Sequence, residues 1–144
     1  MFTSLQSLIE LAESRQLPLH EIILQSEISS SGRSCEALRA DMTRRLETMR
    51  ASVDKGLAGP VHTLSGLSKG NAHKFYTSIR QNNAALTGSC LSRAIARAMA
   101  VGEVNAGMGC IVATPTAGAA GVLPAVLLSL QEARGFSDEQ LVNA

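Results

Sequence analysis

The residues best suited to chemistry lie in one stretch of small side chains, residues 103–124, which reads EVNAGMGCIVATPTAGAAGVLP. Its glycines allow the backbone to approach a ligand or another helix closely. The segment from Thr114 to Gly118 leads toward a helix that we expect to begin at Leu123, and the first N–H groups of a helix lack partners inside it. Such N–H groups bind carboxylates and phosphates readily. The stretch therefore predicts an anion site built mainly from backbone.

The same stretch is also compatible with a purely structural role. Its glycines can serve only to let helices pack closely. Glu103 and Asn105 can cap or pair within the fold, and Thr114 and Thr116 can cap the helix that follows. Residue spacing alone does not separate this interpretation from a binding site.

The three cysteines, Cys35, Cys90 and Cys110, are 55 and 20 residues apart and form no CxxC pair. An odd number with this spacing is not a disulfide framework in a reducing compartment. A free cysteine is often a small buried hydrophobic side chain, and this is the simplest interpretation of each one taken alone.

Short helices are predicted at the beginning of the chain. Thr3 and Gln6 have the spacing of a capping box for a helix that runs to about Arg15. Pro18 suits the first turn of a second helix, which the serines before Gly32 and the glycine itself bring to an end. We expect the two helices to form a hairpin.

The clearest amphipathic helix is predicted from an N-cap at Ser34 to a C-terminal stop at Gly56. Its other face is charged and is expected to be solvated. The predicted inner face consists of Leu38, Met42, Leu46, Met49 and Val53.

The elements around the glycine-rich stretch must hold it in place. Glycines and prolines break every period between residues 56 and 74, which predicts a long irregular loop of the kind that is often functional. A helix is expected from about residue 71 to Arg80, followed by a turn at residues 81–83. The next helix opens at Ser89 or Ser92. Its apolar stripe is predicted to be Leu91, Ala94, Ile95, Ala98 and Met99.

The last predicted helix runs from Leu123 to Gly135, and Ser137 with Gln140 forms a capping box for another helix. Only four residues follow that box, which favours a chain that is the front part of a longer protein. No segment alternates with period two, so we predict an all-α fold. A length of 144 residues favours one domain over residues 1–144.

Composition excludes several classes of protein. Thirteen basic and twelve acidic side chains give a formal net charge of +1, so no electrostatic footprint indicates nucleic acid or an anionic membrane. The longest apolar run, residues 122–130, is far below the roughly 20 residues that span a bilayer. The first residues lack a basic n-region, so we expect a cytoplasmic protein with no signal peptide.

The pattern Glu-Val-Asn-Ala-x-Met-Gly, followed by Ala-Thr-Pro-Thr-Ala-Gly-x-x-Gly-Val-x-Pro, resembles the signature of the iron–sulfur-dependent L-serine dehydratases, and specifically the alpha chain of the two-chain form. Residues 8–13, 55–57 and 65–67 are also similar to the beginning of that chain. The resemblance runs in order along nearly all 144 residues.

The resemblance implies deamination of L-serine to pyruvate and ammonia. It implies a [4Fe-4S] cluster held by three cysteines, whose open iron acts as a Lewis acid on the substrate hydroxyl while a base removes the α-proton. A beta chain, homo-oligomerisation and a small amino-acid substrate are the implied partners. The substrate-binding residues that we predict on this basis are Ser65, Gly66, Asn105, Thr114, Thr116, Ala117 and Gly118.

The sequence departs from the family at the cluster. Some members carry a cysteine just before the Ala-Thr-Pro-Thr run or within the Gly-x-x-Gly step, where this chain has Val112 and Ala119–Ala120. Cys110 is the one cysteine in the stretch and is the candidate ligand. The other ligands are expected beyond residue 144. No base is evident, although His62, Lys69 and His73 accompany the irregular loop.

Three rival functions remain open from the sequence. L-cysteine desulfidation uses a similar domain, and nothing here separates a hydroxyl from a thiol leaving group. Ser68–Lys69 faintly resembles the lysine motif of pyridoxal-phosphate dehydratases, although no alternation of strands and helices accompanies it. The chain can also be a non-catalytic helical assembly module whose glycines only pack helices.

Overall fold

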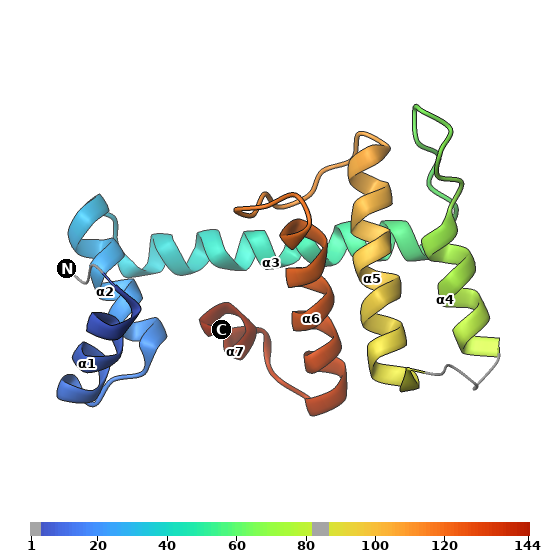
Figure 1. Cartoon of the computed structure of the whole chain (residues 1–144). Helices are drawn as coiled ribbons and strands as arrows, with labels where there is room; N and C mark the ends of the chain where they lie inside the picture. The colour runs from blue at the N-terminus through green and yellow to red at the C-terminus, as the bar shows by residue number, and fades with distance from the viewer. Residues whose placement is uncertain (1–3, 82–86) are drawn as a thin grey trace. The chain divides into compact units, whose positions relative to one another are not determined.

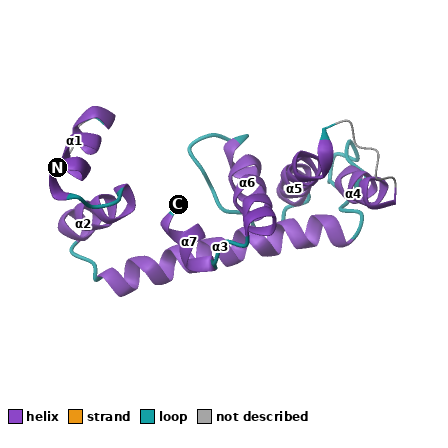
Figure 2. Ribbon diagram, turned by 90° about the horizontal axis from the view of Figure 1, so that it is seen from below, coloured by secondary structure: helices purple, strands orange, loops and turns teal. Residues whose placement is uncertain are grey.

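The computed structural model describes residues 4–81 and 87–144 (Figure 1). These ranges are helical and hold no strand; their one β-bridge, between His62 and Lys69, is isolated (Figure 2). The predicted all-α fold is confirmed. The helices are α1 (Leu5–Arg15), α2 (Leu19–Ser31), α3 (Cys35–Ala58), α4 (Asn71–Gln81), α5 (Gly88–Ala106), α6 (Ala119–Arg134) and α7 (Asp138–Asn143).

The described chain divides into two compact units, one holding residues 4–43 and 142–144 and the other residues 44–141. In the described ranges, no helix is both long enough and apolar enough to cross a membrane. The glycine-rich stretch, residues 103–124, and the loop at residues 59–70 both belong to the second unit. The prediction of one domain stays a prediction.

The first unit contains the predicted hairpin of α1 and α2. Leu8, Ala12 and Ile22 are buried between the two helices. The N-terminal cap of α1 is Ser4, which exchanges side-chain and backbone hydrogen bonds with Ser7 as a capping box. The box predicted for Thr3 and Gln6 involves Thr3, which lies outside the described residues.

The long helix α3 begins as predicted, because the Ser34 hydroxyl accepts a hydrogen bond from the N–H of Ala37 at 3.2 Å. Leu46, Met49 and Val53 are buried, whereas Met42, predicted on the same face, is 41% exposed. Gly56 does not stop the helix, which continues to Ala58. That prediction was wrong because Gly56 lies within α3, where it leaves room for α5 to approach closely.

Gly56 is where α5 crosses α3. A Cβ added to Gly56 would lie 2.6 Å from the Cβ of Ala100 and 2.7 Å from its carbonyl oxygen, so only glycine allows this approach. The face of α5 that is buried carries small residues at intervals of four, Ser92, Ala96 and Ala100. The stripe predicted from apolar residues was therefore wrong, since Leu91, Ile95 and Met99 are exposed.

In the second unit, α5 packs between α4 and α6, and the three helices lie along one side of the second-unit part of α3 (Figures 1 and 2). Helix α6 begins at Ala119, four residues before the predicted Leu123. Gly121 lies inside it, and an added Cβ would stand 3.0 Å from the carbonyl oxygen of Ala98 on α5. Close packing thus overrides the low helix propensity of Gly121 and of Pro124, which is also inside the helix and buried.

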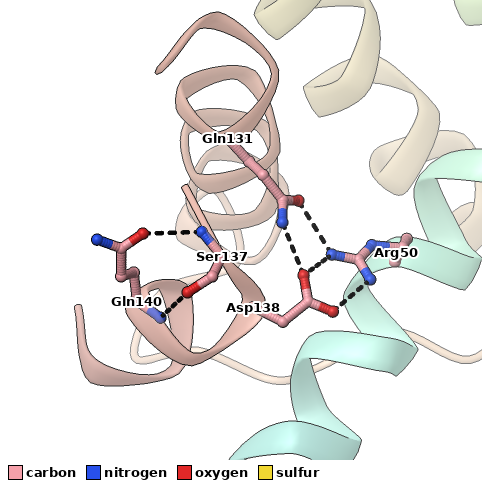
Figure 3. Close-up of polar contacts among 5 residues, drawn as sticks. All are labelled: Arg50, Gln131, Ser137, Asp138 and Gln140. Atoms are coloured by element: carbon pink, nitrogen blue, oxygen red, sulfur yellow. Dashed lines mark hydrogen bonds and ion pairs between the residues drawn. The ribbon is translucent and has the colours of Figure 1, made fainter. Parts of the chain in front are cut away.

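Arg50 of α3 ties the end of α6 to the start of α7 (Figure 3). Its guanidinium donates to both carboxylate oxygens of Asp138, at 2.8 and 3.1 Å, and to the side chain of Gln131 at 3.0 Å. Gln131 in turn donates from Nε2 to Asp138 at 2.7 Å. The hydrogen bond from Arg50, and after it the one from Gln131, lower the pKa of Asp138 to about 2. The capping box predicted for Ser137 and Gln140 is confirmed, with both of its hydrogen bonds formed.

Candidate functional site

Two loops of the second unit meet at one end of the helix layer (Figure 1). One loop, residues 59–70, leads into the N-terminus of α4, and the other, residues 107–118, joins the C-terminus of α5 to the N-terminus of α6. They touch at Gly107, where an added Cβ would stand 2.9 Å from Cγ1 of Val61 and 3.3 Å from the carbonyl oxygen of His62. The predicted Gly/Pro-rich loop that leads into a helix N-terminus is confirmed.

Glu103 joins the signature stretch to the irregular loop. Its side chain is only 6% exposed, and its carboxylate accepts hydrogen bonds from the Ser68 hydroxyl and from the N–H groups of Asn71, at 2.7 Å, and Ala72, at 3.3 Å. The last two are orphan donors in the first turn of α4, so Glu103 caps that helix from a distant position in the chain. The structural alternative considered for this residue is confirmed.

The loop around Ser65 and Gly66 is closed by Thr63. The hydroxyl of Thr63 accepts from the N–H of Ser68 at 3.2 Å and lies 3.3 Å from the Ser65 hydroxyl. Gly66 takes a positive φ of 69° and donates its N–H to the carbonyl oxygen of Thr63 at 3.0 Å. Because Glu103 holds Ser68, the whole turn is fixed to the end of α5.

The C-terminus of α5 ends in a Schellman motif. The N–H of Gly109 bonds to the carbonyl oxygen of Val104 at 2.7 Å, and the N–H of Met108 bonds to that of Asn105 at 3.0 Å. Met108 occupies the left-handed position with a φ of 62°, although glycine is usual there, and its side chain is 78% exposed. The predicted site residue Asn105 therefore takes part in this turn through its backbone.

The glycine at 109 has a steric role rather than a conformational one. An added Cβ there would stand 2.5 Å from Cγ1 of Val104 and 3.5 Å from Nζ of Lys55. Lys55 thus brings a cation of α3 close to Gly109, which directly precedes Cys110. The sequence did not reveal this, because Lys55 lies outside the regular apolar spacing of α3.

The segment before α6 is ordered by its two threonines. The Thr114 hydroxyl donates to the carbonyl oxygen of Thr116 at 2.9 Å, and the Thr116 hydroxyl accepts from the N–H of Ala119, the first residue of α6, at 3.2 Å. The N-cap residue of α6 is Gly118, so Thr116 is not the cap, although its hydroxyl does satisfy the first N–H of the helix. Ala117 and Gly118 are exposed at the start of α6.

The structure does not bring the two predicted carboxylate-binding segments together. The loop that holds Ser65 and Gly66 and the segment that holds Thr114–Gly118 lie on opposite sides of the C-terminal end of α5 in both views (Figures 1 and 2). The two segments are therefore two separate candidates for a carboxylate site.

The candidates for a base, His62, Lys69 and His73, lie in the loop at residues 59–70 or at the start of α4. His73 Nδ1 lies 2.7 Å from the carbonyl oxygen of Leu57, so this ring fastens α4 to the end of α3. His62 and Lys69 face each other in the isolated bridge at the base of the loop. The ring of His73 has a structural partner, which agrees with the structural interpretation of that residue.

A family model described as "Serine dehydratase alpha chain" matches residues 14–144 of this sequence. The chain belongs to the serine dehydratase alpha-chain family. A curated relative from Bacillus subtilis (strain 168), "Probable L-serine dehydratase, alpha chain", is 36% identical over 142 residues, which cover 99% of this chain and 47% of the relative. A second, "L-serine dehydratase, alpha chain" from Peptoniphilus asaccharolyticus, is 30% identical over 143 residues, 99% of this chain and 49% of the relative.

The family signature therefore corresponds to the Schellman turn, the Thr114–Thr116 segment and the start of α6. This chain spans about half the length of the curated relatives it matches.

The three cysteines are free, and Cys90 and Cys110 are exposed. Within residues 4–81 and 87–144, no three His, Cys, Asp or Glu side chains gather as metal ligands. Cys90 is near the start of α5 and Cys110 just beyond its end, and a helix of 19 residues is about 28 Å long. Cys90 and Cys110 are therefore far apart in this structure.

Proposed function

We propose that this chain forms part of an L-serine ammonia-lyase, which dehydrates and deaminates L-serine to pyruvate and ammonia. Membership of the serine dehydratase family and the names of its relatives support the substrate and the reaction class. The observation that carries the proposal for this part of the enzyme is that buried Glu103 fixes the Ser65–Ser68 turn to the signature stretch.

The role proposed for residues 114–118 is to bind the carboxylate of serine. Thr116 holds the first turn of α6 in place, and the exposed backbone of Ala117 and Gly118 stands at a helix N-terminus, which attracts an anion. Gly118 has open space around its Cα, so a ligand can reach the backbone there. The Ser65–Gly66 turn is the second candidate, on the other side of α5.

We assign this chain at most one ligand, Cys110, of a proposed [4Fe-4S] cluster. When bound, such a cluster would supply a Lewis acid for the substrate hydroxyl. The remaining ligands and the base that removes the α-proton are proposed to come from outside residues 1–144. The name "alpha chain" of the relatives supports a beta chain as a further partner.

The test is anaerobic production of pyruvate from L-serine after iron and sulfide reconstitution. We expect no steady turnover by the 144-residue chain alone. We expect turnover when the chain is co-expressed with the part of an alpha chain that it does not match and with a beta chain. Steady turnover by the chain alone would contradict the proposal that the remaining ligands and the base lie outside residues 1–144. An inactive complete assembly would contradict the proposed function.

A further inference from the structure

The outer face of α5 and α6 is apolar. It consists of seven side chains that are 36–55% exposed: Leu91, Ile95 and Met99 on α5, and Val122, Leu123, Val126 and Leu130 on α6. Single exposed apolar residues are common, but a patch that crosses two packed helices is typical of an interaction surface. We define these seven residues as the outer face.

The outer face points away from α3. On α5, the residues against α3 are Ala96 and Ala100, the second of which meets Gly56. Leu91, Ile95 and Met99 repeat every four residues on a different line of the helix. On α6, Gly121 packs against Ala98 of α5 and Gln131 bonds to Arg50 of α3, which leaves Val122 and Val126 on the remaining side.

The charges near the outer face are already paired along the contact between α5 and α6. Glu132 of α6 forms ion pairs with Arg93, at 3.0 Å, and with Arg97, whose side chain is 14% exposed. Arg97 also donates to the Ser129 hydroxyl at 2.6 Å. The surface beside these pairs is therefore one that favours an apolar partner over a charged one.

We infer that the outer face is covered by the part of the serine dehydratase alpha chain that this chain does not match, through an apolar helical surface. The chain accounts for 47% and 49% of two relatives, so about as much polypeptide again has to be placed in the family's alpha chain. Helices α5 and α6 pack on each other, and the outer face is the side of this pair that no other helix of the described second unit covers.

Position along the chain also favours this occupant over a second copy. Val122 and Leu123 lie in the first turns of α6, a few residues after segment 114–118, so whatever covers this end of α6 also borders the stretch that resembles the family signature. This inference rests on family membership and not on the proposed reaction.

The test uses methionine oxidation in a reconstituted complex and needs no substitution. The 144-residue chain is co-expressed with the unmatched part of the Bacillus subtilis alpha chain, and the product is sized by light scattering. We expect a 1:1 complex in which peroxide oxidation of Met99 is largely lost, compared with the chain alone. Met42, which is 41% exposed on α3, is the internal reference that should stay reactive.

Variants add a second, independent measurement. The double substitution Ile95→Glu and Val126→Glu should abolish the complex while helix content by circular dichroism is kept. Leu5→Glu, at a side chain that is 69% exposed on α1, should leave the complex intact. The inference is overturned if no complex forms, if Met99 stays reactive within it, or if the chain alone is a dimer with Met99 protected.

Discussion

At the scale of single residues, Glu103 lies in the stretch that resembles the family signature and also has a structural role. The carboxylate is buried, yet every hydrogen bond described for it goes to Ser68 or to the start of α4. A glutamate in a family signature suggests catalysis, but here the side chain is occupied as a helix cap. Its effect on serine would be exerted through the position of the Ser65–Ser68 turn, which makes it a positioning residue.

Met108 is the residue with the clearest local strain. Its left-handed φ of 62° costs a residue with a Cβ about 1 kcal/mol or more, and the exposed side chain recovers little of that by burial. We therefore expect Met108→Gly to raise the free energy of unfolding by about 1 kcal/mol. Urea denaturation measures this.

The matched control for Met108 keeps the Cβ. Met108→Ala should leave the stability close to that of the unsubstituted chain, because alanine meets the same steric clash in the left-handed region. Equal gains from glycine and alanine would show that the side chain, and not the backbone conformation, is the source of the strain.

At the scale of elements, the sequence predicted the helices better than their contacts. Local sequence patterns predicted the ends of α2 and α4 to within a residue or two. They also predicted the caps at Ser34 and Ser137. The buried face of α5 does not follow its apolar residues. Neighbouring helices approach so closely that only small side chains fit between them, and the larger apolar ones are turned outward. That choice depends on Gly56 and Ala100 meeting, which no local pattern contains.

The same reasoning explains the error at the start of α6. Gly118, Gly121 and Pro124 all argue against a helix locally, yet the helix begins at Ala119. The Thr116 hydroxyl accepts from the first N–H of α6, and contact of Gly121 with Ala98 stabilises the first turns. The two candidate carboxylate-binding segments could each be found in the sequence, but their separation by α5 could not.

The contact between α3 and α5 gives a direct test at this scale. Gly56→Ala should lower the free energy of unfolding by about 1–3 kcal/mol, because its Cβ would overlap Ala100 and its carbonyl oxygen. Gly102→Ala is the matched control within α5, since nothing lies within 4 Å of an added Cβ there. It should raise stability by roughly 0.5–1 kcal/mol through helix propensity. Similar effects of the two substitutions would refute the crossing at Gly56.

At the scale of the second unit as a whole, Arg50 of α3 joins Gln131 of α6 and Asp138 of α7, two helices that lie more than 80 residues further along the chain (Figure 3). The pKa of Asp138 is lowered to about 2 in the folded chain, whereas an unfolded aspartate titrates near 3.9. A depressed carboxyl pKa stabilises the fold above the unfolded value, and this stabilisation is lost as pH falls from about 4 to about 2.

Asp138→Asn should consequently reduce stability at neutral pH and make less difference as the pH falls. Urea midpoints measured between pH 7 and pH 2.5 check this, with Glu139→Gln on the exposed side of α7 as the control. The pairing with Arg50 would be contradicted if the difference in urea midpoint between Asp138→Asn and the unsubstituted chain stayed constant down to pH 2.5.

The central claim is that the backbone at the start of α6 binds the carboxylate of serine, and Gly118→Ala tests it most directly. The φ of Gly118 is −67° and an added Cβ meets nothing within 4 Å, so folding should survive. Gly59, also in open space but at the end of α3, provides the control Gly59→Ala.

The measurement is the KM for L-serine in the complete dehydratase carrying either substitution, with thermal stability recorded beside it. A methyl group between the backbone and the carboxylate should raise KM by about tenfold or more, which corresponds to roughly 1.4 kcal/mol of binding, with Tm nearly unchanged. Gly59→Ala should leave KM as it is. An unchanged KM in a folded Gly118→Ala enzyme would contradict carboxylate binding at the start of α6. It would favour the Ser65–Gly66 turn as the carboxylate site.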